Sequence, residues 1–224
     1  MLKNILSFLI VFSLTIVSVT KAQTNKELTT MPSYTPNIGE GKKIFNICSK
    51  CHGIEGWGAS NGDFPQLAGQ HQSVIIKQLH DIRSGKRDNP IMRRVILDLA
   101  SQEEQAIVDV AAYIETLKMD PEPEVGEADD EVLKTAEITY AKKCASCHGA
   151  NGEGLAEKFY PLLQGQHYEY LLRQLKHIQS GKRKNANKEM QKVISQMSFI
   201  ELDHLADFIS RLEPPENKIA PMAE

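Results

Sequence analysis

Apolar residues recur at helical spacing along most of the chain, and no segment shows the period-two alternation that predicts a strand. The pattern predicts helices over residues 38–48, 71–84, 129–144 and 167–180. A further helix closes each half of the chain, with apolar positions at Ile107, Val110, Ala111, Ile114 and Leu117 in the first half and at Leu202, Leu205, Phe208, Ile209 and Leu212 in the second. We therefore expect an all-α fold.

Local signals agree with these helix boundaries. The helices predicted at 71–84 and 167–180 both end directly before a glycine, as helices with a glycine C-cap do. The last helix of each half opens with a capping-box sequence, at Ser101–Glu104 and at Ser198–Glu201. The same signals thus occur in both halves of the chain.

Aligning the sequence with itself at an offset of 96 residues reveals an internal repeat. The offset pairs Cys48 with Cys144, His52 with His148, Gly69–His71 with Gly165–His167, and Ser84–Arg87 with Ser180–Arg183. A repeat of this length is a duplicated domain rather than a solenoid unit. We predict one domain at residues 38–118 and a second at residues 129–213.

Four segments lie outside the two predicted domains. Residues 1–22 contain an apolar run that is too short to span a bilayer, followed by small residues before Gln23, so we expect a cleaved secretory signal peptide rather than an uncleaved membrane anchor. Residues 119–128 carry prolines and acidic residues and predict a solvated linker. Residues 23–37 and 214–224 also contain prolines and predict flexible ends.

The composition narrows the class of protein. A hydrophobic content of 41% is too low for a polytopic membrane protein, and a formal net charge of −3 argues against a general nucleic-acid binder. Aromatic residues make up only 6% of the 224 residues, which is few for a core of this size. A large apolar cofactor could supply the apolar volume that the aromatic residues do not.

All four cysteines lie in two C-x-x-C-H sequences, Cys48–His52 and Cys144–His148, and this is the attachment sequence of c-type haem. One helical turn places both sulfurs along one edge of a porphyrin, where each forms a thioether with a vinyl group. A thiol–disulfide oxidoreductase needs neither the histidine nor a second copy. A zinc ribbon keeps about 15–20 residues between its pairs, whereas 92 separate these.

We therefore predict two covalently bound haem c groups. Their thioethers would come from Cys48, Cys51, Cys144 and Cys147, and one axial ligand of each iron from His52 or His148.

Methionines are the leading candidates for the second axial ligand. Met92 and Met190 lie in corresponding loops between the second and last predicted helices of each half, and we predict that Met92 binds the iron of haem 1 and Met190 that of haem 2. A thioether ligand raises the reduction potential of the iron. Met197 is a rival, but the matching position in the first half is Leu99, so we expect Met197 in the core.

Ligation of each iron by two histidines is an alternative. His71 and His167 also repeat, and each follows a Gly-Gln pair at the start of a predicted helix. At such a position we expect a histidine to cap the helix, meet solvent or approach a haem propionate instead.

The chain resembles the class I dihaem cytochromes c, close to the cytochrome c4 type, over roughly residues 38–212. The resemblance is carried by both C-x-x-C-H-G sequences, the paired Gly-Gln-His segments, Ser-Gly-Lys-Arg before each methionine loop, and Asn89–Met92. It implies two tandem helical domains, packed with a pseudo-twofold relation, whose haems exchange electrons rapidly. It also implies that Pro65 and Pro161 offer their carbonyls to Nδ1–H of His52 and His148. The second methionine loop departs from the pattern, since it is longer and lacks the proline.

Two protein ligands on each iron leave no open position for a substrate, so we expect an electron-transfer protein and not an enzyme. The leading hypothesis is a periplasmic carrier that passes single electrons between redox proteins, from a respiratory donor toward a terminal oxidase or reductase, including membrane respiratory complexes. One alternative is the cytochrome subunit of a periplasmic dehydrogenase, for example one with a flavin, and a weaker one is a dihaem peroxidase. We expect neither nucleic acid nor a small-molecule substrate as partner.

Basic residues gather near the predicted ligand loops and could steer acidic partners, although a solubilising face is the simpler explanation. They are Arg83, Lys86, Arg87, Arg93 and Arg94 in the first half and Lys182, Arg183, Lys184, Lys188 and Lys192 in the second.

Overall fold

The computed structural model describes residues 34–100 and 104–222. Within these ranges the chain forms helices and two isolated bridges, and no strand. The elements are α1 (Ile38–His52), α2 (Gln72–Arg83), α3 (Pro90–Ala100), α4 (Glu104–Thr116), α5 (Asp130–Lys143), α6 (Ala145–His148), η1 (Ala156–Lys158), α7 (Tyr168–Gln179), α8 (Lys188–Ile194), α9 (Phe199–Ser210) and η2 (Glu216–Lys218). The predicted signal peptide at 1–22 and the first predicted capping box lie outside the described residues.

The predicted long helices are confirmed with small changes at their ends. α1 continues past the predicted end at residue 48 to His52, where Gly53 takes a positive φ of 80°. The counterpart of α1 is split into α5 and α6 at Cys144. The second capping box is present, because Ser198 and Glu201 each accept the backbone N–H of the other at the start of α9.

Two short helices were not predicted, since the sequence indicated only ligand loops there. α3 and α8 occupy these loops, and an asparagine side chain caps each first turn. Asn89 Oδ1 accepts the N–H of Met92 at 3.1 Å, and Asn187 Oδ1 accepts the N–H of Met190 at 3.4 Å. The caps supply partners for N–H groups that a helix start otherwise leaves unpaired.

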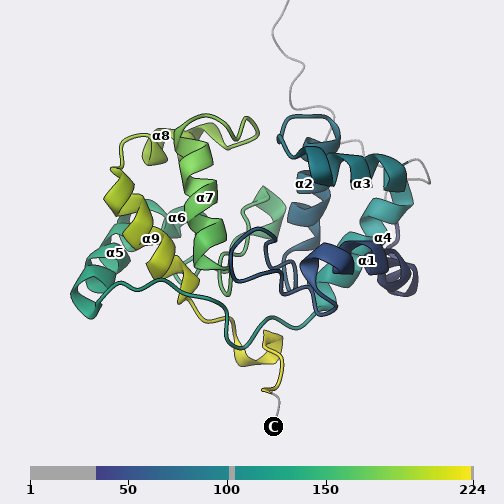
Figure 1. Cartoon of the computed structure of the whole chain (residues 1–224), viewed down its shortest axis with the longest axis horizontal. Helices are drawn as coiled ribbons and strands as arrows, with labels where there is room; N and C mark the ends of the chain where they lie inside the picture. Colours follow the sequence, from purple (N-terminus) through teal and green to yellow (C-terminus); the bar gives the residue numbers. More distant parts are fainter. Residues whose placement is uncertain (1–33, 101–103, 223–224) are drawn as a thin grey trace, which may run out of the picture. The chain divides into compact units, whose positions relative to one another are not determined.

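Each repeat has a separate apolar core that includes its last helix. Figure 1 shows these last helices, α4 and α9, in two separate groups of helices. In the first repeat α4 packs against α1 and α2, and in the second α9 packs against α5 and α7. Ile107, Val110 and Ala111 of α4 are fully buried, as are Leu202 and Ala206 of α9. The predicted apolar stripe of each last helix is thus its core face.

A buried aspartate on each last helix fixes the segment that leads into its repeat. Asp109 Oδ1 accepts the N–H of Asn37 at 2.8 Å, just before α1. Asp207 accepts the N–H groups of Gly126 at 3.0 Å and Ala128 at 2.7 Å, just before α5. Both carboxylates therefore have backbone partners in place of water.

The two repeats contact each other through hydrogen bonds that are the same in both directions. The side-chain amide of Gln166 accepts the backbone N–H of Gln66 and donates to its carbonyl, both at 3.0 Å. The side-chain amide of Gln70 does the same to Leu162, at 3.0 and 2.8 Å. The 96-residue offset pairs Gln70 with Gln166 and Gln66 with Leu162. The repeats therefore pack with the pseudo-twofold relation that the resemblance implied.

The segments predicted as a solvated linker (119–128) and a loose C-terminal end (214–224) contact each other through their backbones at Met119. Met119 is 1% exposed. Its N–H donates to Lys218 O at 2.8 Å, and its carbonyl accepts the N–H of Ala220 at 2.9 Å. An extended segment lying against a domain must pair its buried N–H and C=O groups, and here the C-terminal residues provide the partners.

We expect Gln166→Ala to lower the free energy of unfolding by about 2 kcal/mol, because it leaves the N–H and C=O of Gln66 buried without partners. Chemical denaturation of the haem-loaded protein measures the loss. Gln70→Ala is the matched variant at the symmetry-related contact and is expected to cost the same. Gln196→Ala, at an exposed position, is the control. A loss for Gln166→Ala no larger than that of the control would contradict the role of the contact.

None of the helices in the described residues combines the length and the apolar character needed to cross a membrane.

Candidate functional site

The predicted thioether cysteines and histidines lie at the end of the first helical segment of each repeat. Cys48, Cys51 and His52 all belong to α1, with Cys48 half-buried and Cys51 exposed. In the second repeat α6 carries Cys147 and ends at His148. The same arrangement of one half-buried and one exposed cysteine recurs there. The first C-x-x-C-H sequence is therefore wholly helical, whereas in the second the helix breaks at Cys144 and resumes from Ala145 to His148.

Both histidine rings are oriented by the backbone carbonyl of a proline 13 residues further along the chain. His52 Nδ1–H donates to Pro65 O at 3.0 Å, and His148 Nδ1–H donates to Pro161 O at 3.3 Å. The partners that the resemblance implied are confirmed. With Nδ1 bound in this way, each neutral ring carries its lone pair on Nε2, the nitrogen available for a metal.

The loop that presents the Pro65 carbonyl depends on a glycine. Gly58 has a φ of +83°, and a Cβ there would lie 2.3 Å from Phe64 O. Gly154, its counterpart, has a φ of +72°, and a Cβ there would lie 2.5 Å from Tyr160 O. Only glycine gives both the positive φ and the close approach.

His52 fits an iron ligand. Its side chain is 4% exposed, and Nε2 is buried with no hydrogen-bond partner in the structure. Burial lowers the pKa of His52, and the bond to Pro65 O opposes this only in part, so the ring is neutral. A buried, neutral nitrogen without a partner is what an axial haem ligand requires. Burial likewise lowers the pKa of His148, which is 8% exposed.

The cysteines do not resemble the thiolates of a disulfide oxidoreductase. Burial raises the pKa of Cys48 to about 11 and that of Cys144 to about 11, whereas a redox-active C-x-x-C lowers the pKa of its nucleophilic thiol. All four cysteines are free. This arrangement fits thiols that are to be alkylated by haem vinyl groups.

The two predicted methionine ligands occupy equivalent positions. Met92 and Met190 are each the third residue after the capping asparagine, so the longer second loop reaches the same helix start as the first. Both side chains are half-buried, and Met190 packs against the core of its repeat. The rival, Met197, is 4% exposed and belongs to that core, as expected.

His71 and His167 bond across to the other repeat. His71 Nε2 lies 2.8 Å from Glu153 O, and His167 Nε2 lies 2.7 Å from Trp57 O. Both acceptors are carbonyls, so both Nε2 atoms donate. The structure thus commits these nitrogens to the backbone instead of directing them at an iron, and the interface role was not visible in the sequence.

Comparison with known proteins identifies the protein family to which the two sites belong. The family model described as Cytochrome c matches residues 38–118 and 133–213, one match to each repeat. The chain belongs to the cytochrome c family. Two matched domains, each with its C-x-x-C-H sequence, mean that this cytochrome carries two covalently bound haem c groups.

Similar proteins include cytochromes c4 and a dehydrogenase's electron acceptor. Cytochrome c4 of Pseudomonas aeruginosa is 30% identical over 195 residues, which cover 83% of this chain and 93% of the relative. A thiosulfate dehydrogenase electron acceptor of Stutzerimonas stutzeri is 34% identical over 201 residues, covering 82% and 91%. The crystal structure of reduced recombinant cytochrome c4 from Pseudomonas stutzeri aligns with a TM-score of 0.68 at 27% identity, covering 80% of this chain and all of that one. The predicted fold of two tandem cytochrome c domains is confirmed.

Proposed function

We propose that this cytochrome carries single electrons between redox proteins in the periplasm, with one electron held at each haem. In the proposed sites Cys48 and Cys51 hold haem 1, and His52 and Met92 bind its iron. Cys144 and Cys147 hold haem 2, and His148 and Met190 bind its iron. The observation that carries the proposal is the repetition of one arrangement: an imidazole oriented by a proline carbonyl, and a methionine placed by an asparagine cap.

The chain's own residues would shield each iron from water and hold its ligands in fixed orientations. Haem iron, when bound, supplies the one-electron couple. The Pro65 and Pro161 carbonyls fix the ring orientation and strengthen the imidazole ligand. Burial of His52 and His148 keeps water from the iron and reduces the reorganisation that accompanies each electron transfer. With both axial positions taken, neither haem offers a coordination site to a substrate.

A dedicated electron acceptor of a dehydrogenase is the second candidate. One similar protein is described as a thiosulfate dehydrogenase electron acceptor, and the chain matches nearly all of it. In that case the same two haems would receive electrons from one enzyme instead of serving several partners. A stable complex with a dehydrogenase on purification favours this role, and a free cytochrome favours the general carrier.

The predicted domain boundaries and cellular location form part of the proposal. We propose cytochrome domains at 38–118 and 129–213 joined by residues 119–128, with export directed by a signal peptide at 1–22. The family match to residues 38–118 and 133–213 supports the domains. Covalent attachment of haem to exported cysteines supports the periplasm.

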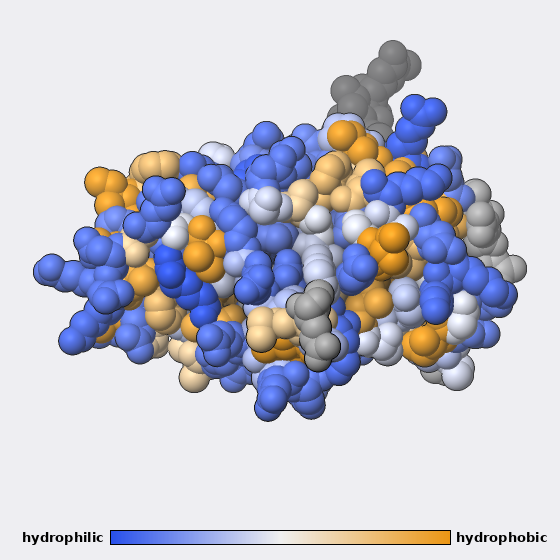
Figure 2. Space-filling view, turned by 60° about the horizontal axis from the view of Figure 1, so that its bottom comes forward, coloured by the Kyte–Doolittle hydropathy of each residue, from blue (hydrophilic) through white to orange (hydrophobic). Residues whose placement is uncertain are grey.

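One face of the molecule offers partners separate groups of apolar residues. The face drawn in Figure 2 is mainly hydrophilic, with hydrophobic groups separated by hydrophilic residues. Ile54 is 79% exposed and directly follows the His52–Gly53 pair, and Ile91 is 71% exposed and directly precedes Met92. Ala150 and Glu189 hold these places in the second repeat, so the two haem sites are bordered differently.

Some of the basic residues near the predicted ligand loops are held by contacts within the protein. Arg83 pairs with Glu104 at 2.9 Å, and Arg87 and Arg183 bond to each other's repeat at the domain boundary. The other predicted basic residues remain exposed, namely Lys86, Arg93 and Arg94 in the first repeat and Lys182, Lys184, Lys188 and Lys192 in the second. Docking partners of acidic charge would meet these side chains.

Potentiometric titration of the purified cytochrome, followed by optical and magnetic spectra, tests the proposal. We expect two covalent haems that resist acid–acetone extraction, two one-electron couples, and methionine–histidine ligation at both irons. Addition of peroxide should give no turnover. A chain that releases its haem on extraction, or one haem with an open or bis-histidine iron, would overturn the proposed function.

A further inference from the structure

The methionine loop of the second repeat is longer than that of the first by two residues, Lys184 and Asn185. In the first repeat one residue separates Arg87 from the asparagine that caps α3, whereas in the second repeat three residues separate Arg183 from the asparagine that caps α8. Lys184 is exposed, but Asn185 is half-buried. The insertion therefore places a polar side chain where the shorter loop has no counterpart.

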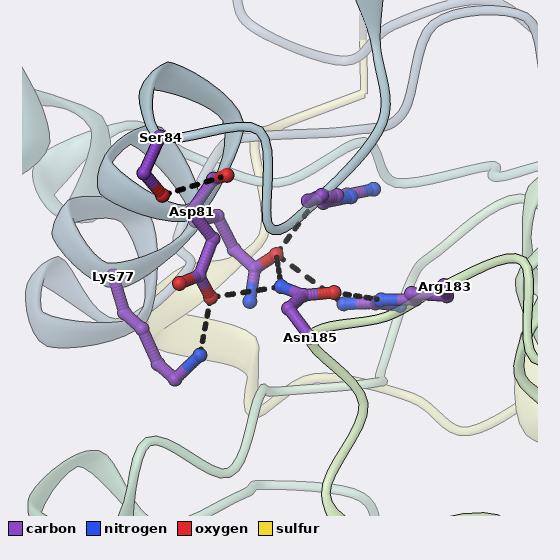
Figure 3. Close-up of polar contacts among 7 residues, drawn as sticks. Lys77, Asp81, Ser84, Arg183 and Asn185 are labelled. Atoms are coloured by element: carbon purple, nitrogen blue, oxygen red, sulfur yellow. Dashed lines mark hydrogen bonds and ion pairs between the residues drawn. The ribbon is translucent and has the colours of Figure 1, made fainter. Parts of the chain in front are cut away.

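The side chain of Asn185 contacts the first repeat. Its Nδ2 donates to Asp81 Oδ2 at 2.8 Å and to Gln78 Oε1 at 3.3 Å, and both acceptors belong to α2. Figure 3 shows Asn185 bonded to the carboxylate of Asp81, which Lys77 contacts from the same helix. Asp81 is 9% exposed, so its carboxylate takes these two donors in place of water. The bond between the repeats is thus a hydrogen bond to a buried charge, which is stronger than one between neutral groups.

The same amide also fixes its own loop. Asn185 Oδ1 accepts from Arg183 Nε at 3.3 Å, and the N–H of Ala186 donates to Arg183 O at 3.1 Å, which closes a tight turn. The residue after this turn is Asn187, whose side chain caps α8 and accepts the N–H of Met190 at 3.4 Å. A single residue separates Asn185 from this cap, so the contact with α2 places the start of the helix that carries Met190.

The contact has no equivalent in the opposite direction. The 96-residue offset pairs Asp81 with His177, so the second repeat has no carboxylate at this place. Asp88, the single residue before the first capping asparagine, is exposed, and its side chain makes no hydrogen bond or ion pair with the residues that the structure describes. The neighbouring contacts between glutamines and arginines do occur in both directions. The bond from Asn185 to Asp81 is therefore an asymmetric addition to a symmetric set of contacts.

We propose that Asn185 is a positioning residue for Met190, so that the first repeat holds the axial ligand of the haem in the second. The inference rests on the proposed function, in which Met190 binds the iron of haem 2. A ligand on a loop that is already held in its bound position loses less conformational freedom on binding, so it is harder to displace. Met92 lies on the shorter loop, which lacks this residue. The two haems should therefore differ in how readily an added ligand replaces the methionine.

Titration of the oxidised, haem-loaded cytochrome with imidazole tests the role of Asn185, because imidazole displaces methionine from ferric haem and removes the methionine–iron absorption band. In Asn185→Ala we expect half of the band to disappear at an imidazole concentration about tenfold below that of the wild type, the factor that corresponds to one lost hydrogen bond to a charged group. The other half should titrate as before. Adding Asn185→Ala to Met92→Ala, which keeps only the band of haem 2, assigns the weakened site.

Asp81→Ala removes the acceptor of the same bond from the other repeat. The substituted residue lies in the first repeat, yet the expected effect is at haem 2, where the same half of the band should weaken. Lys77 loses its partner in this variant but is partly exposed and can meet water. Asp88→Ala is the matched control, since it shortens an exposed acidic side chain of the first loop. It should leave both halves of the titration at their wild-type concentrations.

Exchanging the two side chains separates the hydrogen bond from general packing. Asn185→Asp alone brings two carboxylates together, and the methionine of haem 2 should then be displaced more easily. Combining it with Asp81→Asn again sets an amide donor opposite a carboxylate, so the imidazole concentration should return toward the wild-type value. A packing role for these two positions would not give this rescue, because the exchange hardly changes the shape of either side chain.

Amide hydrogen exchange gives a second readout, which does not depend on the residue that binds the iron. In Asn185→Ala we expect the amides of residues 184–190 to exchange faster than in the wild type and those of residues 87–92 to be unchanged, because only one loop loses its anchor.

The possible failures are distinguishable. An imidazole titration of Asn185→Ala that matches the wild type, a weakening of both haems alike, or unchanged exchange over residues 184–190 would overturn the positioning role of Asn185 alone. A band of haem 2 that survives in Met190→Ala would instead overturn the ligand of the proposed function.

Discussion

Met92→Ala is expected to lower the reduction potential of one haem on the order of 0.1–0.3 V and to leave the other nearly unchanged. The choice of axial ligands changes the reduction potential of a haem over a range of roughly 0.8 V. A thioether is the ligand that stabilises ferrous iron. The ferric methionine–iron absorption band should fall by about half, since one of two sites loses it. Met190→Ala should remove the other half and lower the other potential. Potentiometric titration with optical detection measures both effects.

Met197→Leu is the control for these variants, because Met197 is buried in the core of the second repeat. A leucine of similar volume should cost less than about 1.5 kcal/mol of stability and leave both potentials in place. If Met197→Leu removed an absorption band and Met190→Ala did not, the proposed ligand of haem 2 would be wrong.

Gly41→Ala is expected to lower the free energy of unfolding of the first repeat by about 3 kcal/mol. Gly41 lies where α1 crosses α4, and a Cβ there would be 2.1 Å from Asp109 O and 2.6 Å from its carbonyl carbon. Both atoms are backbone, so the helices would have to separate. Chemical denaturation followed at the band of haem 1 measures the loss.

Gly39→Ala on the same helix is the matched control. The nearest atom to its Cβ would be Asn37 Oδ1 at 3.3 Å, the end of a side chain that can move. We expect this variant to be neutral or to gain up to about 1 kcal/mol from helix propensity. Equal losses in the two variants would show that helix propensity, and not the crossing, decides the effect.

The sequence predicted best the features that occur in both repeats, because each repeat could be compared with the other. The 96-residue offset located both C-x-x-C-H sequences and the long helices, and with two extra residues in the second loop it also paired the candidate ligands Met92 and Met190, because these features depend on local spacing. It also separated Met190 from Met197, since Leu99 showed that the second position is apolar in both repeats. The structure agrees, with Leu99 at 6% and Met197 at 4% exposure.

Features that no residue spacing marks in the sequence were missed. α8 spans only Lys188–Ile194 and depends on the cap from Asn187, which reads in sequence as one more polar loop residue. The Gln66–Gln166 contact joins residues that are 100 apart, and glutamine has no spacing pattern that marks an interface. The acidic composition of residues 119–128 indicated a solvated linker. The end of this segment is instead fixed by the N–H groups of Gly126 and Ala128, which donate to Asp207.

The symmetric glutamine contacts have a consequence for how the molecule behaves at low concentration. An interface in which each half gives the other the same residues is the kind that a homodimer uses, and a homodimer dissociates on dilution. Here residues 119–128 join the halves covalently, which sets a local concentration that does not depend on how much protein is present. The two redox centres therefore stay paired at any protein concentration. A single repeat expressed alone would expose the amides of this interface unless it paired with a second copy.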